Sequence, residues 1–294
     1  MDKVMSLEDS VRQFVADGSC IFLGAGHEAL IPFSVVYELV RQGPRHLTFS
    51  APISDIAGDI LIGSGLVDAV RLAWLGNVSG GLGHNFRRAR EQGIPHPVTL
   101  IDTSNYGMAL ALQATAMGLP FLPTKTLQGT DLMASRAGFE PFSWHGESLV
   151  AVPAFQPDVA FIGVQVADAA GNGRLDGPLG MTREAATAAR EVVLLCERLV
   201  PDLFAETPRW QVTVPGFRVN AVVPVRFGFH PSPALGCYGR DTAFFLEYHE
   251  KTRTVDGFRS WLDHWVLSGP HEEYLTRLGD ERLLRLEREE GIWQ

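Results

Sequence analysis

Thr103, Ser104 and Asn105 are three consecutive polar residues whose side chains can hydrogen-bond to the free N–H groups of a helix. They follow an apolar run of strand length, 98–101, and precede a segment of helix-forming residues, 108–117, which ends at a glycine. The sequence therefore predicts a strand, a polar loop and a buried helix whose N-terminus presents N–H groups and an amide. Such a place favours an oxyanion or a carbonyl oxygen. The alternative is that Asn105 only caps the helix.

A glycine-rich loop is the second candidate; it follows the predicted strand 20–23 and reads Gly24-Ala25-Gly26-His27-Glu28. With the next alanine it matches the dinucleotide pattern G-x-G-x-x-G/A. Pro32 would fall inside the helix that this pattern must open, and no acid ends the predicted second strand, 47–50, to bind a ribose. A nicotinamide site is therefore disfavoured. The loop still lets backbone approach a ligand closely, and His27 and Glu28 at its tip are either catalytic or surface residues.

A third loop, rich in proline and glycine, carries His230 and Tyr238 after the predicted strand 219–225. Loops at strand ends often carry function, although a lone histidine there is about as often structural. Isolated acids that could act as covalent nucleophiles are Glu28, Glu140 and Glu147. None of them has a convincing setting. The chain has no H-x-H or H-E-x-x-H pair and no G-x-S-x-G elbow, so it predicts no metal site and no serine hydrolase of that type.

Short apolar segments alternate with helical or loop segments along the chain. The predicted strands are 20–23, 47–50, 69–75, 98–101, 149–152, 159–164, 192–195 and 219–225. Because they lack in/out alternation, they predict an α/β fold with a mostly parallel sheet sandwiched by helices. We expect one domain, 1–294, with 240–294 as a helical C-terminal extension. Trp261, Trp265 and Trp293 carry too much aromatic surface for this tail to stand free in water.

Composition narrows the function classes. The 294 residues are 46% hydrophobic and 20% charged, which is ordinary for a globular chain. The start of the chain has acids where a secretory signal needs bases, and no apolar run reaches membrane-spanning length, so we expect a cytoplasmic protein without membrane contact. Cys20, Cys196 and Cys237 are far apart and odd in number, which favours reduced thiols. A net charge of -9 disfavours nucleic acid as a partner.

Three stretches of sequence, DGSCIFLGAGHEALIP, LPFLPTKTLQGTDL and FGFHPSPALGCYGRD, occur in this order ahead of the tryptophan-rich tail. Together they resemble the alpha subunit of the family I CoA-transferases, closest in pattern to the alpha subunit of glutaconate CoA-transferase. The resemblance implies a heteromeric acyl-CoA:carboxylate CoA-transferase of carboxylic acid catabolism, in which a glutamate of a beta subunit is the nucleophile. It also implies a coenzyme A thioester as substrate and no permanently bound cofactor.

The resemblance implies a role for Asn105. In the family, an amide ahead of the helix that leads to the LPFLP-like segment donates to the thioester oxyanion, and residue count places Asn105 there. The expected walls of the substrate or partner-facing pocket are Gly24, Ala25, Gly26, His27, Glu28, Ser104, Gln128, Gly129, His230 and Tyr238. The chain departs from the family in two ways: its glycine loop is not G-G-F, and asparagine is one methylene shorter than the usual glutamine.

Two other functions remain open. A related branch of two-subunit hydrolases, resembling enzymes that open the last rings of steroid catabolites as CoA thioesters, has a glutamate at the position of Asn105, where it would act as a base. An uncharged asparagine cannot take a proton in that way, so transfer is favoured unless His27 or Glu28 replaces the acid. The third reading is a non-catalytic paralogue that binds an acyl-CoA or a partner subunit.

Overall fold

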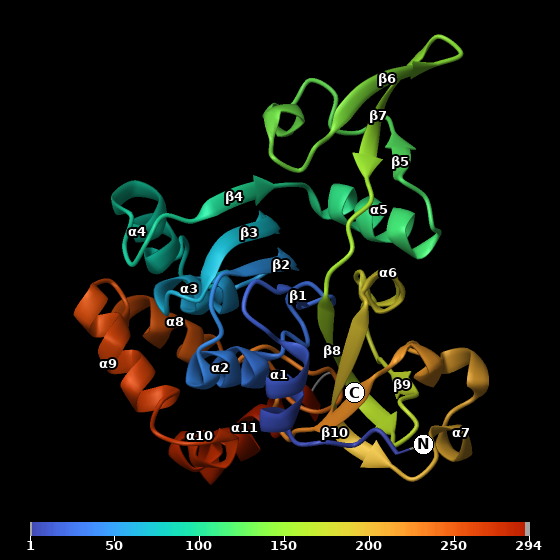
Figure 1. The fold of residues 1–294 in the computed structure, drawn as a ribbon. Helices are drawn as coiled ribbons and strands as arrows, with labels where there is room; N and C mark the ends of the chain where they lie inside the picture. Colours follow the sequence, from blue (N-terminus) through green and yellow to red (C-terminus); the bar gives the residue numbers. More distant parts are fainter. Residues whose placement is uncertain (1, 292–294) are drawn as a thin grey trace.

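The fold is built on one large sheet, seen in a computed structural model that describes residues 2–291 (Figure 1). The strand order is β11-β10-β8-β1-β2-β3-β4, and all neighbours in it pair in parallel. The strands are β1 (Cys20–Leu23), β2 (Leu47–Ile53), β3 (Val67–Trp74), β4 (Thr99–Asp102), β8 (Val159–Asp168), β10 (Glu191–Val200) and β11 (Ala221–Pro224). The short β9 (Gly173–Arg174) folds back antiparallel to β8. The predicted mostly parallel α/β sheet is confirmed.

Helices cover this sheet in two layers. On one side, α1 (Leu7–Phe14), α2 (Phe33–Gln42), α3 (Ile56–Gly63) and α4 (His84–Gln92) pack side by side. On the other side, α5 (Asn105–Ala116) packs against α6 (Thr182–Ala188) (Figure 1). The inner strand β8 is buried at all ten positions, as the apolar run 159–164 predicts for most of its length, whereas β4 at the sheet edge is half-buried throughout.

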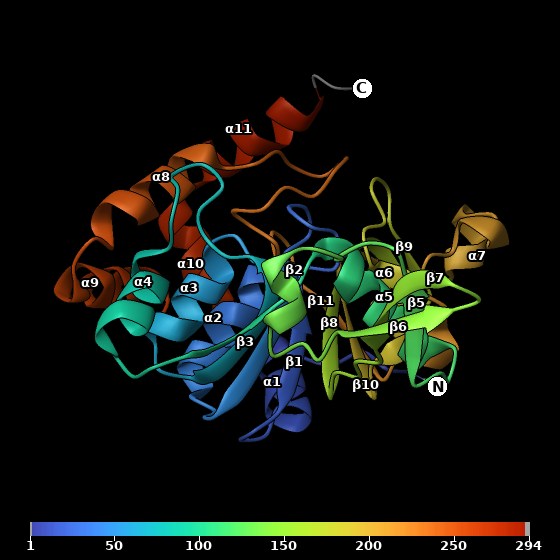
Figure 2. The same cartoon turned by 90° about the horizontal axis from the view of Figure 1, so that it is seen from above.

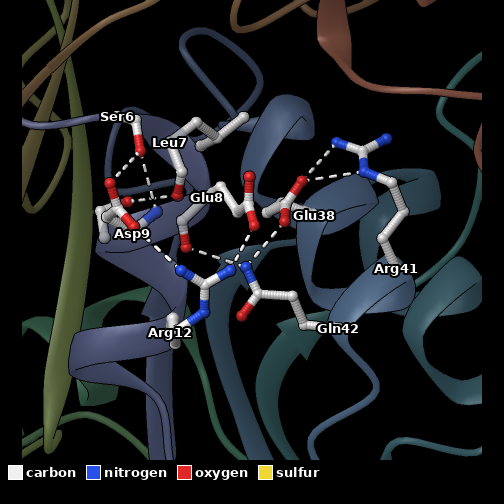
Figure 3. A network of polar contacts seen from close by, with 9 residues as sticks. Ser6, Leu7, Glu8, Asp9, Arg12, Glu38, Arg41 and Gln42 are labelled. Atoms are coloured by element: carbon white, nitrogen blue, oxygen red, sulfur yellow. Dashed lines mark hydrogen bonds and ion pairs between the residues drawn. The ribbon is translucent and has the colours of Figure 1, made fainter.

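The first helix, α1, begins directly after a serine, a residue type that commonly caps helices. Ser6 is the N-cap of α1, and its Oγ accepts from the Asp9 N–H at 3.0 Å. A polar network then ties α1 to α2 (Figure 3): Gln42 Nε2 donates to the Glu8 carbonyl at 2.9 Å and to the Glu38 carboxylate at 2.7 Å. Arg41 Nε donates to the same Glu38 carboxylate at 2.8 Å. The bond from Gln42 to Glu8 joins the two helices, and the two bonds to Glu38 hold Gln42 and Arg41 within α2.

A second, smaller sheet projects from the body (Figure 1). Its antiparallel strands are β5 (Phe121–Thr124), β7 (Glu147–Pro153) and β6 (Glu140–Trp144), in the order β5-β7-β6. The prediction that 149–152 belongs to the parallel sheet is therefore wrong. The segment is apolar because Val150 and Val152 pack with Leu110 of α5 in a separate small core, and periodicity cannot tell this from burial in a parallel sheet.

Four helices end the described chain: α8 (Thr242–Lys251), α9 (Val255–Trp265), α10 (His271–Leu278) and α11 (Asp280–Gly291) (Figure 2). Trp261 and Trp265 are 3% and 7% exposed and join the core of the main sheet, which confirms that this tail packs back. Trp293 lies outside the described residues. The remaining short elements are α7 (Leu203–Glu206) and the 3₁₀ turns η1 (Asp131–Ala134), η2 (Arg209–Gln211) and η3 (Gly216–Arg218). Among residues 2–291, no helix combines the length and apolarity needed to span a bilayer.

Candidate active site at the carboxyl edge of the sheet

The loops that follow β1 to β4 meet at one edge, because these strands run parallel. Gly24, after β1, lies against the end of β2, and a Cβ there would stand 3.5 Å from the Ile53 carbonyl oxygen. After β4, the Thr103 N–H donates to the Leu72 carbonyl of β3 at 3.2 Å. In parallel α/β sheets, this carboxyl edge is where ligands bind. Two of the loops predicted to form the site therefore lie on the expected edge.

Asn105 is the first residue of α5, and the capping is done by its neighbour. Ser104 is the N-cap, and its Oγ accepts from the Gly107 N–H at 2.9 Å. The reading in which Asn105 only caps the helix is therefore not supported. Asn105 Oδ1 is buried and has no hydrogen-bond partner within the described residues 2–291. An unsatisfied buried acceptor costs free energy and is uncommon, and no described residue gives this amide oxygen a partner.

The glycine loop is held in a backbone form that few residues adopt. Gly24 and His27 both have positive φ, at +69° and +64°. The Ala25 carbonyl accepts from the Met181 N–H at 2.8 Å, which anchors the loop to the start of α6. His27 is half-buried and Glu28 is exposed at the tip, as the sequence predicts for residues that can meet a ligand.

Gly180 packs directly against the glycine loop, at Ala25 and His27. A Cβ at Gly180 would stand 2.1 Å from the Ala25 carbonyl oxygen and 2.8 Å from His27 Nδ1, so Gly180→Ala must displace the loop. We expect this variant to lower both the thermal midpoint and the activity of the assembled enzyme. Gly118→Ala is the matched control, because Gly118 has a similar positive φ of +69° with nothing within 4 Å of its Cβ position. Equal effects in the two variants would show that backbone strain alone, and not the loop contact, is responsible.

The third loop carries His230 and Tyr238, which were expected to line the pocket, but the structure buries both side chains. His230 and Tyr238 are each 1% exposed, so their side chains lie beneath the surface and are closed to a ligand. His230 bonds to Asp241 at 2.9 Å and to the Tyr274 hydroxyl at 2.5 Å. Burial lowers the pKa of His230, although the Asp241 carboxylate opposes this. The loop can shape a pocket through its backbone and position, but these two side chains support it from inside.

Glu197, near the end of β10, fixes the start of this loop. Its carboxylate accepts from the Phe227 and Gly228 N–H groups at 2.7 and 3.0 Å and from the Tyr238 hydroxyl at 2.7 Å. Burial raises the pKa of Glu197 to about 7, against the lowering effect of these donors. Glu197 is thus a structural acceptor, because its carboxylate oxygens already accept hydrogen bonds from three donors.

Gln128 and Gly129 lie after β5, on the small projecting sheet. Gln128 Nε2 donates to the Ser148 carbonyl at 2.6 Å, and Gly129 has a φ of +72°. The Gln128 amide thus bonds within the projecting sheet rather than to the glycine loop or to Asn105, so the place of these two residues in the pocket stays a prediction. Glu140 and Glu147 lie on the same small sheet, and Glu147 is paired with Lys125.

An ion pair at the carboxyl edge was not predicted from the sequence. Asp55 is fully buried at a φ of +45°, and its carboxylate accepts from Arg240 Nη2 at 2.7 Å and from the Val78 N–H at 3.2 Å. Burial raises the pKa of Asp55, and Arg240 opposes this. Arg240 also stacks 3.8 Å from the Phe245 ring centroid. The sequence signal was an acid after a strand, but β2 ends at Ile53 and not at Ser50, which hid it.

Asp55 does not supply the acid that a dinucleotide site would need, because its carboxylate is buried and already paired with Arg240. Between residues 2 and 291, no group of three or more His, Cys, Asp and Glu side chains is placed to hold a metal ion. The groups at the carboxyl edge that could take part in a reaction are the uncharged Asn105 amide, backbone N–H groups and the tip of the glycine loop.

Known proteins share this whole architecture. The family model for coenzyme A transferase matches residues 4–224. The chain is 35% identical over 270 residues to the alpha subunit of 3-oxoadipate CoA-transferase from Pseudomonas knackmussii, covering 90% of this chain and 94% of that one. It is 31% identical over 311 residues to the alpha subunit of glutaconate CoA-transferase from Acidaminococcus fermentans, covering 99% and 97%. The crystal structure of that glutaconate coenzyme A-transferase superposes with a TM-score of 0.90 over 97% of this chain.

A hydrolase subunit is also similar, at lower identity. The IpdA subunit of a cholesterol ring-cleaving hydrolase from Rhodococcus jostii is 26% identical over 286 residues, covering 93% of this chain and 94% of its own. The family model covers three quarters of the chain, and the glutaconate coenzyme A-transferase structure matches its fold. This chain belongs to the coenzyme A transferase family.

Proposed function

We propose that this chain is the alpha subunit of a two-subunit acyl-CoA:carboxylate CoA-transferase. The observation that carries the proposal is the Asn105 amide, which stands at the N-terminus of α5 on the carboxyl edge while Ser104 does the capping. An amide N–H aimed at a thioester oxygen stabilises the negative charge that develops when a nucleophile attacks the carbonyl carbon. The two relatives named as CoA-transferase alpha subunits support the same reaction class.

The nucleophile in this proposal comes from a beta subunit. Glu28 is exposed, and Glu140 and Glu147 lie on the projecting sheet, where Glu147 is paired with Lys125. Asp55 is buried and paired with Arg240. A glutamate carboxylate of the partner attacks the thioester carbonyl carbon, the carbonyl π electrons move onto oxygen, and collapse of this intermediate expels the CoA thiolate. The thiolate then attacks the glutamyl carbonyl of the anhydride, which releases the first acid as its carboxylate and leaves a glutamyl-CoA thioester. The second carboxylate attacks this thioester and expels the thiolate again, and the thiolate attacks the acyl carbonyl of the new anhydride, which forms the new acyl-CoA and frees the glutamate. In these reaction steps, the Asn105 amide donates a hydrogen bond to the negatively charged oxygen of the intermediate.

The acyl group in this proposal is a dicarboxylic acid. The two CoA-transferase relatives described above are named for dicarboxylates, 3-oxoadipate and glutaconate. The test is to copurify the chain with a beta subunit that carries the glutamate, and then to incubate the complex with a dicarboxylic acyl-CoA. CoA should move to an added carboxylate, with no steady release of free CoA when the acceptor is left out. Steady release without acceptor would instead establish the hydrolase function, with His27 or Glu28 as the base.

A further inference from the structure

The helical tail contains a groove of about 350 Å³ between α8 and α9. Small-molecule sites commonly have this size. The groove is lined by one face of each helix: Gly257, Ser260, Trp261, His264 and Trp265 on α9, and Glu247 and Lys251 on α8. Figures 1 and 2 both show these two helices on the side of the molecule away from the small projecting sheet. None of the groups described at the carboxyl edge lines this groove.

The groove begins where α8 and α9 cross closely. A Cβ at Gly257 would stand 2.2 Å from the Lys251 carbonyl oxygen, so only glycine fits at this crossing without a shift of the helices. Behind the groove, the ring of Trp261 packs edge-on against two rings of α8, at 4.9 Å from Tyr248 and 5.9 Å from Phe244 between centroids. The walls of the groove are therefore fixed by close packing.

Trp261 brings a hydrogen-bond donor to this groove. The residue is 3% exposed, and its Nε1 is buried without a partner among residues 2–291. The second tryptophan of the groove differs, because Trp265 Nε1 donates to the Glu247 carboxylate at 3.3 Å. Buried indole N–H groups usually have an acceptor. The groove therefore lacks an acceptor beside Trp261, which an oxygen atom of a ligand would supply.

Lys251 brings a positive charge to the same groove. Its side chain is exposed and forms no ion pair with a carboxylate in the described part of the chain. The one acid in the lining, Glu247, already accepts from Trp265. Ser260 is exposed on α9 and adds a hydroxyl group. An ammonium group, the N–H of Trp261 and a hydroxyl together favour a ligand with a negatively charged oxygen, because hydrogen bonds to an ionised acceptor are the stronger ones.

The rest of the lining is apolar or aromatic. The indole rings of Trp261 and Trp265 form the wall on α9, and the ring of His264 lies 4.8 Å from that of Trp265. The methylene groups of Lys251 can cover apolar surface while its ammonium group stays in water. Inorganic phosphate would leave these apolar walls without contacts. A carboxylate that carries an apolar, flat group makes use of both the charge and the rings.

We propose that the groove between α8 and α9 binds a small carboxylate whose other end is apolar, such as an aromatic acid. The carboxylate oxygens accept from Trp261 Nε1 and pair with the Lys251 ammonium group, and the apolar end lies against Trp265. This site is separate from the carboxyl edge, and it does not depend on the proposed function, because no residue of the catalytic proposal takes part in it.

Calorimetry on the full chain tests the site with three probes that share one ring and differ in charge: benzoate, benzyl alcohol and benzylamine. Benzoate should bind at least tenfold more tightly than benzyl alcohol, and benzylamine should bind most weakly. Lys251→Gln should raise the Kd for benzoate about tenfold and leave that for benzyl alcohol unchanged. Arg259→Gln is the matched control, because it removes an exposed cation of α9 that lies outside the lining, and it should change neither Kd.

The indole N–H resonance of Trp261 gives a second readout. In ¹⁵N-labelled full chain, this signal is assigned as the one that is lost in Trp261→Phe, and saturating benzoate should shift it downfield, as a new hydrogen bond does. The inference is overturned if benzoate does not bind, if its binding leaves this resonance unchanged, or if Lys251→Gln leaves its Kd unchanged. Equal binding of benzyl alcohol or inorganic phosphate, or tighter binding of benzylamine, would also contradict it.

Discussion

Replacing Asn105 with alanine is expected to lower kcat of the assembled enzyme about 100-fold while leaving the fold at least as stable as before. The loss follows because one oxyanion donor contributes on the order of 3 kcal/mol to the barrier, and each 1.36 kcal/mol is a factor of about ten. The stability follows because the variant removes an acceptor, Oδ1, that is buried without a partner in the described chain, and because alanine favours helix. Steady-state kinetics and thermal unfolding of the same preparation measure both.

Three further substitutions, two in this turn and one later on α5, separate the effect on turnover from the effect on stability. Asn105→Asp keeps the shape but replaces the donor with a negative charge, so it should be at least as slow as alanine. Ser104→Ala should show the reverse stability effect, a loss of about 1 kcal/mol, because it removes the cap to Gly107. Gln113→Ala, on the exposed side of α5, should change neither quantity. If Asn105→Ala turns over at the wild-type rate with the complex intact, the amide has no part in the reaction.

The largest stability effect is expected at Asp241, beneath the third loop. Its carboxylate accepts from His230 Nε2 at 2.9 Å and from Arg282 Nε at 2.5 Å, and it caps α8 through the Phe244 N–H at 3.1 Å. Asp241→Ala leaves the Arg282 charge without its partner and His230 without its acceptor. Breaking a buried pair in this way costs about 3–5 kcal/mol. Denaturant unfolding should show this as a lower midpoint.

The control for Asp241 is another aspartate on the same helical tail. Asp256 on α9 is 94% exposed and pairs only loosely with Arg259, at 3.8 Å. Asp256→Ala should change the free energy of unfolding by about 0.5 kcal/mol or less. If the two alanine variants unfold alike, the buried network does not stabilise the tail.

The pH dependence of the same variant follows from the pKa shift. Burial alone would raise the pKa of Asp241, but the hydrogen bonds from His230 and Arg282 outweigh it and hold the pKa well below its usual range. The carboxylate therefore stabilises the fold fully above the unfolded pKa of about 3.9, and this contribution is lost as pH falls toward the folded pKa. The difference between wild type and Asp241→Ala should shrink below about pH 4. A difference that grows on acidification would contradict this assignment.

Local sequence signals located most of the secondary structure and the two loops at the carboxyl edge. The polar turn at 103–105 and the glycine loop lie where residue types and neighbours predict, because capping and positive φ depend on a few adjacent residues. The apolar strands also predicted the parallel sheet, since burial on both faces needs continuous apolar residues. The family resemblance, carried by three distant stretches, predicted the reaction class before any contact was visible.

The sequence by itself thus determined the fold class and the residue types at the carboxyl edge. Only the tertiary structure decided which side chains remain available there. Ser104 caps the helix, so the Asn105 side chain is not used as a cap, and its Oδ1 has no partner in the described chain. His230 and Tyr238 are buried, so a ligand cannot reach their side chains. The pairing of Asp55 with Arg240, which are far apart in the chain, was equally invisible. The physical reason is that hydrogen-bond partners and burial depend on long-range packing, which local periodicity does not encode.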